Sequence, residues 1–169
     1  TIQTTAQLAL GTWTHVAAVR SGSSAKIYFD GVEAASGTIS GTGTTSANPL
    51  RIGAGWLGGS ASNFLSGRID EPRIYNRALA PTEITALYEN TSPPTSGLVA
   101  YIPMEEGLGT TTAIEDGTGA IIGTATLTGG PTWHPQTPPK LVSGRALAEK
   151  CVSLDGVNDC VVLPDSSIW

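Results

Sequence analysis

The residues of this chain whose type could support catalysis are two pairs of neighbouring carboxylates. Asp70 precedes Glu71, and Glu105 precedes Glu106. A glycosidase needs two carboxylates on opposite sides of a cleft, one of them acting as an acid. Neighbouring residues of a β-strand point to opposite faces, so neither pair forms such a couple by itself. No nucleophile motif or phosphate-binding loop accompanies them, and the sequence therefore predicts a protein that is not an enzyme.

The histidines give no stronger indication of catalysis. His15 falls on the apolar face of an expected strand together with Trp13, which favours a structural, hydrogen-bonded role. His134 lies in a proline-rich stretch without an obvious Ser or Asp partner. We therefore assign neither residue as a general base.

The two cysteines flank a turn signal. Asp155-Gly156 is a preferred pair for a two-residue type I′ hairpin turn, and Cys151 and Cys160 lie at equal distances on either side of it. If this hairpin forms, the cysteines face each other at a non-hydrogen-bonded site, where Cα atoms are about 4.5 Å apart. We therefore predict a disulfide and an extracellular or cell-surface location. The alternative is two free buried thiols, and a zinc site lacks a second pair of ligands.

Composition excludes several classes of function. The chain has 169 residues with 21 Gly, 11 Pro and only 14% charged residues, which suits short strands joined by tight turns. The net charge is −5 and the basic residues are scattered, so nucleic acid is not an expected partner. No apolar run reaches the ~18 residues of a membrane span. The chain opens and stops within a pattern, so we expect it to be a piece of something longer.

The elements that position these residues are mostly strands. Apolar segments separated by Gly-, Ser- and Thr-rich turns predict strands near 13–20, 25–30, 32–39, 49–55, 64–75, 98–104, 120–127, 145–154 and 157–163. Polar or proline-rich loops are expected at 41–48, 56–63, 110–119 and 129–139. Asp30-Gly31 is a second hairpin signal. The pattern predicts an all-β protein, an antiparallel β-sandwich.

One short helix is expected near 81–88, directly after the strand 64–75. Ile84, Leu87 and Tyr88 have the i, i+3, i+4 spacing of an apolar helix face, and Pro81 suits the first helical position. A segment rich in Pro, Ser and Thr at 91–96 then predicts a linker. This linker divides the chain into residues 1–90 and 97–169.

Both parts resemble the LamG-like jelly-roll family of the concanavalin A-like lectin/glucanase superfamily. The first part carries the resemblance in Trp13-Thr14-His15-Val16-Ala17, Ile27-Tyr28-Phe29-Asp30-Gly31, Leu50-Arg51-Ile52-Gly53 and 64–88. The second carries it in 97–101, Glu105-Glu106-Gly107, 154–159 and Leu163-Pro164-Asp165-Ser166. The family has small residues and tyrosine more often where Cys151 and Cys160 stand here, which adds to the case for the disulfide.

The resemblance implies that the two parts stand in reversed order. Residues 1–90 resemble the C-terminal half of a sandwich, and residues 97–169 resemble the N-terminal half. Three arrangements fit this order: a chain that straddles two tandem domains, a shortened and circularly permuted domain, or halves exchanged between subunits in a filament. A half-sandwich alone exposes an apolar face and unpaired edges. The expected partners are therefore copies of this chain or a neighbouring tandem domain.

The resemblance also implies a function and two kinds of site. We expect a non-enzymatic, extracellular structural or adhesive unit that can self-assemble head-to-tail into a filament through exchanged halves, with a carbohydrate-binding module of a larger secreted protein as the alternative. Calcium, the one expected cofactor, would use oxygen ligands from Asp70, Glu71, Asp116, Asp155 and Asp159. Trp56 and Trp133, both expected in loops, could stack on a sugar ring or instead cap the core.

Overall fold

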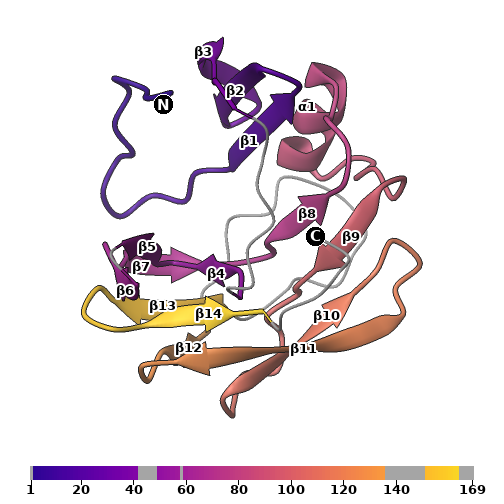
Figure 1. Cartoon of the computed structure of the whole chain (residues 1–169). Helices are drawn as coiled ribbons and strands as arrows, with labels where there is room; N and C mark the ends of the chain where they lie inside the picture. Colours follow the sequence, from indigo (N-terminus) through magenta and orange to yellow (C-terminus); the bar gives the residue numbers. More distant parts are fainter. Residues whose placement is uncertain (1, 42–48, 58, 136–150, 164–169) are drawn as a thin grey trace. The chain divides into compact units, whose positions relative to one another are not determined.

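The computed structural model describes residues 2–41, 49–57, 59–135 and 151–163, which form antiparallel strands and one helix (Figure 1). These residues divide into two compact units. The first unit contains residues 2–41 and 75–97, and the second contains 49–74, 98–135 and 151–163. The predicted fold class is confirmed, because antiparallel sheets dominate and a single short helix accompanies them in the described part of the chain.

The first unit packs a three-stranded sheet against the helix. Strands β1 (Val16–Ser21), β2 (Ser24–Phe29) and β3 (Val32–Thr38) are neighbours in chain order. The predicted Asp30-Gly31 turn joins β2 to β3, and both turn residues have positive φ angles, 50° and 80°. A type I′ turn needs this backbone conformation, and Gly adopts it without steric cost.

The helix α1 (Pro81–Glu89) begins where the sequence predicts and ends one residue later than predicted. Pro81 occupies the first turn, and Asn90 closes the helix in the left-handed conformation, with its N–H donating to the Leu87 oxygen. Ile84 is buried together with Tyr28 and Leu79, and Leu87 packs beside them. This small apolar cluster joins the helix to one face of the sheet.

The second unit encloses a larger core between two sheets. A six-stranded sheet has the order β4-β14-β11-β10-β9-β8, and a three-stranded sheet has the order β12-β13-β7. The bounds are β4 (Arg51–Ile52), β7 (Ser66–Ile69), β8 (Arg73–Tyr75), β9 (Leu98–Tyr101), β10 (Thr111–Glu115), β11 (Ile121–Thr128), β12 (Thr132–His134), β13 (Cys151–Asp155) and β14 (Cys160–Val162). A hairpin of β5 (Gly55–Leu57) and β6 (Ser60–Ser62) stands outside both sheets.

Buried aliphatic side chains from both sheets make this core. Its members are Ala100, Ile102, Met104, Ile114, Ala125, Leu127, Val152, Leu154, Val161 and Leu163. Ile52, Ile69, Ile74 and Trp133 are partly buried against them. The core therefore draws on strands that precede the 91–96 segment as well as on strands that follow it.

Strands from both sides of this segment pair directly. Strand β7 pairs with β13 from Val152 opposite Ile69 to Asp155 opposite Ser66. Strand β4 pairs with β14, with Val161 opposite Ile52. Strand β8 lies beside β9, and the Ile102 N–H donates to the Pro72 oxygen at 3.0 Å. Strands β4, β7 and β8 thus complete both sheets that the described strands of residues 98–135 and 151–163 form.

Four expectations about local structure are wrong. The expected strand 64–75 is interrupted, and its two parts, β7 and β8, lie in different sheets. Glu71 adopts a left-handed φ of 50° and Pro72 has no N–H for a ladder, so the strand cannot continue. The expected loop 56–63 contains the β5–β6 hairpin, 110–119 contains β10, and 129–139 contains β12. Long-range packing of Thr112, Ile114 and Trp133 stabilises strands that local composition did not indicate.

Candidate functional site

The predicted hairpin of the two cysteines is also wrong. Strand β13 pairs with β12 and β7, whereas β14 pairs with β11 and β4, so Cys151 and Cys160 lie in different sheets. Both residues are buried and outside any disulfide, which agrees with the stated alternative of two buried thiols. Residues 156–159 then arch from β13 to β14, and hydrogen bonds within residues 155–159 hold this arch.

Two of the predicted calcium ligands shape this arch. The Asp155 carboxylate accepts a hydrogen bond from the Val157 N–H at 2.8 Å. The Asp159 carboxylate is buried and accepts from the Asp155 N–H at 2.9 Å. A short acidic side chain that bonds to nearby backbone is a common turn former, and both carboxylates have this role here.

Glu71 takes part in a different structural cluster. Its carboxylate lies 3.2 Å from the Arg73 guanidinium and accepts a hydrogen bond from the Tyr101 hydroxyl at 3.1 Å. The Arg73 guanidinium lies over the Tyr101 ring, 4.3 Å from its centre. The charge of Glu71 is therefore balanced by an arginine that a cation–π contact holds in place.

Asp116 organises the turn between β10 and β11. Its carboxylate accepts hydrogen bonds from the Thr118 hydroxyl at 2.6 Å, the Thr118 N–H at 2.8 Å and the Ala120 N–H at 3.2 Å. These bonds, led by the one from the hydroxyl, lower the pKa of Asp116 below its usual value. Hydrogen bonds donated to a carboxylate oxygen favour the ionised form of the group.

The predicted calcium ligands therefore occupy three places in the second unit: Asp70 and Glu71 after β7, Asp116 in the β10–β11 turn, and Asp155 and Asp159 in the arch. Among the described residues, no three His, Cys, Asp or Glu side chains gather in a way that could hold a metal ion. The described structure does not bring the five predicted ligands into one group, and calcium binding stays a prediction. In the part of the chain that the structure describes, no helix is long and apolar enough to cross a membrane.

The two predicted sugar-stacking residues differ in exposure. Trp56 on β5 is 44% exposed, and the Arg51 guanidinium lies 4.1 Å from the centre of its ring. Trp133 on β12 packs against the core, and its indole N–H donates to the Gly109 oxygen at 2.9 Å. Only Trp56 presents an aromatic surface of the kind that stacks on a ligand.

Sequence reasoning missed a polar face on the sheet β12-β13-β7. The inward residues Trp133, Val152 and Ile69 form one cross-strand row, so the residues on either side of each point to the opposite face. This polar face carries Arg68, Asp70, Thr132, His134, Cys151 and Ser153. The alternation of apolar and polar residues in each short strand is a signal that could have predicted it.

A thiol and an imidazole are neighbours on this polar face. His134 lies directly opposite Cys151, and its Nε2 is 3.0 Å from the Arg68 guanidinium. Burial, followed by the charge of Asp70, raises the pKa of Cys151 to about 11. The thiol is therefore protonated at neutral pH and is a poor nucleophile. The side chains of this polar face can donate and accept hydrogen bonds, but they do not activate Cys151 as a nucleophile.

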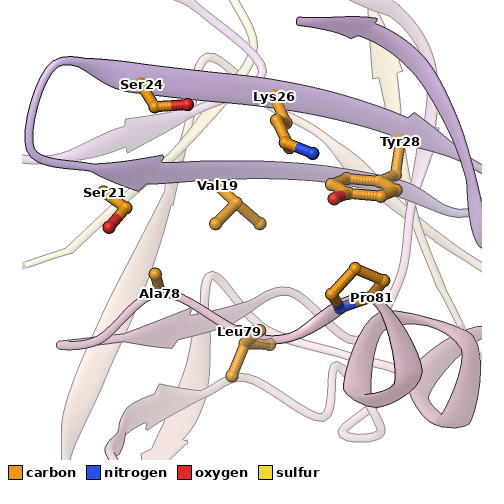
Figure 2. Close-up of a pocket in the computed structure, with 8 residues that line it drawn as sticks. All are labelled: Val19, Ser21, Ser24, Lys26, Tyr28, Ala78, Leu79 and Pro81. Atoms are coloured by element: carbon orange, nitrogen blue, oxygen red, sulfur yellow. The ribbon is translucent and has the colours of Figure 1, made fainter.

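The first unit has a small groove of its own. Val19, Ser21, Ser24, Lys26 and Tyr28 on the β1–β2 hairpin face Ala78, Leu79 and Pro81 across it (Figure 2). Its volume is about 150 Å³, below the ~300 Å³ at which small-molecule sites begin. Lys26 is paired with Glu33 at 2.7 Å, so its charge is already balanced.

Comparison with known proteins identifies the family. The model of the concanavalin A-like lectin/glucanases superfamily, Laminin_G_3, matches residues 1–85. The chain belongs to this superfamily. The match covers the first unit's sheet and helix start and also β4 to β8 of the second unit. No curated protein and no solved structure matches the chain. Membership of a lectin/glucanase superfamily fits the sandwich, but it does not choose between sugar binding, catalysis and a structural role.

Proposed function

We propose that this chain is a non-catalytic structural and adhesive module that acts outside the cell or on its surface. Its sandwich is closed by strands of the same chain from both sides of the 91–96 segment. The pairing of β7 with β13 is the observation that carries the proposal, because it joins residues 66–69 to residues 152–155. A closed sandwich leaves no half-core exposed and can act as a stable unit of a larger assembly.

The roles of the carboxylates support a non-catalytic function. Glycoside hydrolysis needs a carboxylic acid whose pKa is raised, with a second carboxylate across a cleft. The carboxyl groups of Glu33, Glu83 and Asp116 have lowered pKa values, because each accepts hydrogen bonds from its neighbours. Glu71 is neutralised by Arg73. These groups hold turns and ion pairs together rather than exchange protons.

A cross-linking experiment tests whether the sandwich closes within one chain. Ser66 and Asp155 are exposed and directly opposite each other on β7 and β13. The double variant Ser66→Cys/Asp155→Cys should form a disulfide within the chain after mild oxidation, because opposite residues of a strand pair lie within disulfide reach. Non-reducing electrophoresis and light scattering should show a monomer. Linked dimers or ladders, absent from the Ser66→Cys control, would overturn the closed module and favour exchanged halves.

Carbohydrate binding is the second candidate function, and the exposed ring of Trp56 favours it. Aromatic side chains provide the apolar surface on which a sugar ring stacks, while Arg51 beside Trp56 can donate hydrogen bonds. A glycan screen followed by titration should show binding that Trp56→Ala abolishes and Trp56→Phe partly retains. Trp133→Phe is the matched control, since its ring packs on the core. Binding that survives Trp56→Ala would contradict this assignment.

A further inference from the structure

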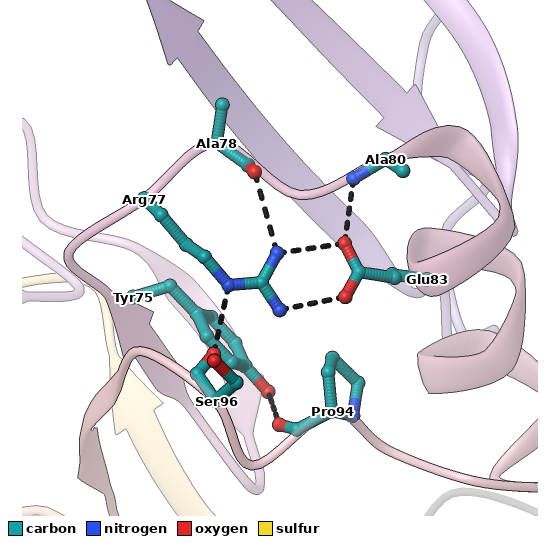
Figure 3. Close-up of polar contacts among 7 residues, drawn as sticks. All are labelled: Tyr75, Arg77, Ala78, Ala80, Glu83, Pro94 and Ser96. Carbon is teal, nitrogen blue, oxygen red and sulfur yellow. Dashed lines mark hydrogen bonds and ion pairs between the residues drawn. The ribbon is translucent and has the colours of Figure 1, made fainter.

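Arg77 holds three segments of the first unit together. Its Nη1 and Nη2 donate to the two Glu83 carboxylate oxygens at 2.8 and 2.6 Å, and its Nε donates to the Ser96 oxygen at 2.9 Å (Figure 3). Glu83 also accepts a hydrogen bond from the Ala80 N–H at 2.8 Å. This is the glutamate half of a capping box, the other half being impossible because Ala80 has no side-chain acceptor. The helix start and the 91–96 segment are thus bonded to one guanidinium.

Two neighbours of Arg77 bind the same segment. The Tyr75 hydroxyl donates to the Pro94 oxygen at 2.8 Å (Figure 3). The Asn76 N–H donates to the Gly97 oxygen at 2.9 Å. Residues 75–77 are therefore bonded to residues 94–97 at three points, and we call this set of contacts the linker clasp.

Gly97 fits the linker clasp because it has no side chain. Its φ is +76°, a conformation that other residues rarely adopt. A Cβ placed on it would lie 3.0 Å from both the Asn76 Oδ1 and the Arg77 Cγ. The close approach of residues 76 and 77 to residue 97 thus depends on glycine at this position.

The linker clasp lies between two neighbouring strands. Strand β8 ends at Tyr75 and β9 begins at Leu98, and the two strands are adjacent in the six-stranded sheet. We propose that the linker clasp keeps strands β4, β7 and β8 paired with β14, β13 and β9 of the same chain, and that its release lets two copies of this chain exchange these strands. This inference rests on the proposed closed module. The partner it names is a second copy of the chain.

The closed form and the exchanged form differ in only some of their bonds. In exchanged dimers the strand pairs β7–β13, β4–β14 and β8–β9 are made again, between copies, so they favour neither form. Exchange requires the 91–97 segment to open into a hinge, and Pro93-Pro94 suits an extended one. Opening breaks the three bonds of the linker clasp and replaces them with bonds to water. The linker clasp is therefore the set of contacts that the closed form has and the exchanged form lacks.

Two mild variants test whether the linker clasp prevents exchange between copies, and each is combined with the Ser66→Cys/Asp155→Cys cross-link. Tyr75→Phe removes one hydrogen bond and keeps the ring, and Gly97→Ala adds the Cβ that the closed clasp excludes. Each should raise the fraction of interchain cross-links at high protein concentration by about two- to tenfold per hinge, the effect of one lost hydrogen bond. Tyr88→Phe, the same chemical change on α1 away from the linker clasp, should leave that fraction unchanged.

The outcomes separate the two proposals. Interchain cross-links in the otherwise unchanged protein would overturn the closed module itself. Intrachain cross-links in that protein and in both clasp variants would overturn the proposed role of the linker clasp in preventing exchange. They would still support the closed module. Circular dichroism melts verify folding, and Tyr75→Phe, which keeps the packing of its ring, provides the readout if Gly97→Ala does not fold.

Discussion

Cys151 and Cys160 occupy two different sheets of the second unit, although only eight residues separate them in the sequence. Each is buried on its own strand and lies outside any disulfide. Burial raises the pKa of both, that of Cys151 to about 11. Both cysteines are therefore protonated thiols at neutral pH, and no disulfide joins them.

Thiol titration should distinguish this arrangement from the hairpin disulfide. We expect both thiols to react slowly with a disulfide reagent in the native protein at pH 8, since neither the thiolate form nor access is available. Both should react rapidly in denaturant, and the native rate should increase as the pH approaches 11. A protein that shows no reactive thiol even when unfolded without reductant would contradict the free-thiol state.

Gly129 is packed against backbone, and its replacement should be costly. A Cβ at this position would collide with the Asn158 carbonyl group, and φ is +98°. Gly129→Ala should lower the free energy of unfolding by about 2 kcal/mol or more, measured by urea denaturation. Gly130→Ala is the matched control, because φ is +108° there but nothing lies within 4 Å of the added Cβ. Equal losses at the two positions would show that the close contact has no energetic effect.

The Glu83–Arg77 pair should make stability depend on acidity. The hydrogen bonds from Arg77 and the Ala80 N–H lower the pKa of Glu83 from 4.5 to about 2. A carboxylate whose pKa is lower in the folded state stabilises the protein fully above its unfolded pKa and loses that contribution as the pH falls. The difference in unfolding free energy between the wild type and Glu83→Gln should therefore be constant near neutrality and shrink between about pH 4.5 and 2.

The control for this acid dependence is Glu89→Gln at the other end of the same helix, an exposed carboxylate. The difference in unfolding free energy between Glu89→Gln and the wild type should be small across that pH range. Chemical denaturation series at several pH values give both differences. A Glu83→Gln difference that does not change with pH would show that the ion pair is not formed in solution.

Ile114 should contribute far more to stability than a neighbouring isoleucine of the same sheet. Its side chain is fully buried between the sheets of the second unit, whereas Ile121 on β11 is 69% exposed. Ile114→Ala should lower the free energy of unfolding by about 2–5 kcal/mol because it leaves a cavity. Ile121→Ala should cost less than about 0.5 kcal/mol. Similar losses in denaturant titrations would contradict the described core.

Local features of the fold were predictable because a few neighbouring residues decide them. Asp30-Gly31 forms its turn since both positions take positive φ angles, and Pro81 starts the helix that Ile84 and Leu87 anchor. The resemblance of residues 13–88 to the concanavalin A-like superfamily is likewise carried by short motifs, and the family match covers most of them. The sandwich class followed from alternation and turn spacing alone.

Pairing partners were not predictable because they depend on contacts between distant residues. The Asp155-Gly156 signal is compatible with a hairpin, but Ile69 and Ile52 pair with Val152 and Val161 and so draw the two arms into separate sheets. The sequence did not decide whether Trp133 stacks on a ligand or packs on the core. In the structure its ring packs on the core and its indole N–H donates to the Gly109 oxygen. The polar face around His134 likewise exists only because three strands from distant positions align.

The sequence by itself thus determined most of the strand-forming segments, the helix, the Asp30-Gly31 turn and the family. Backbone preferences and alternation act over a few residues and can be recognised in them directly. The tertiary structure alone decided that the strands before the 91–96 segment complete the sheets formed after it, and that Tyr75 and Arg77 are bonded to that segment. Many segments of this chain can pair as strands, and burial of a shared apolar core selects which of them do.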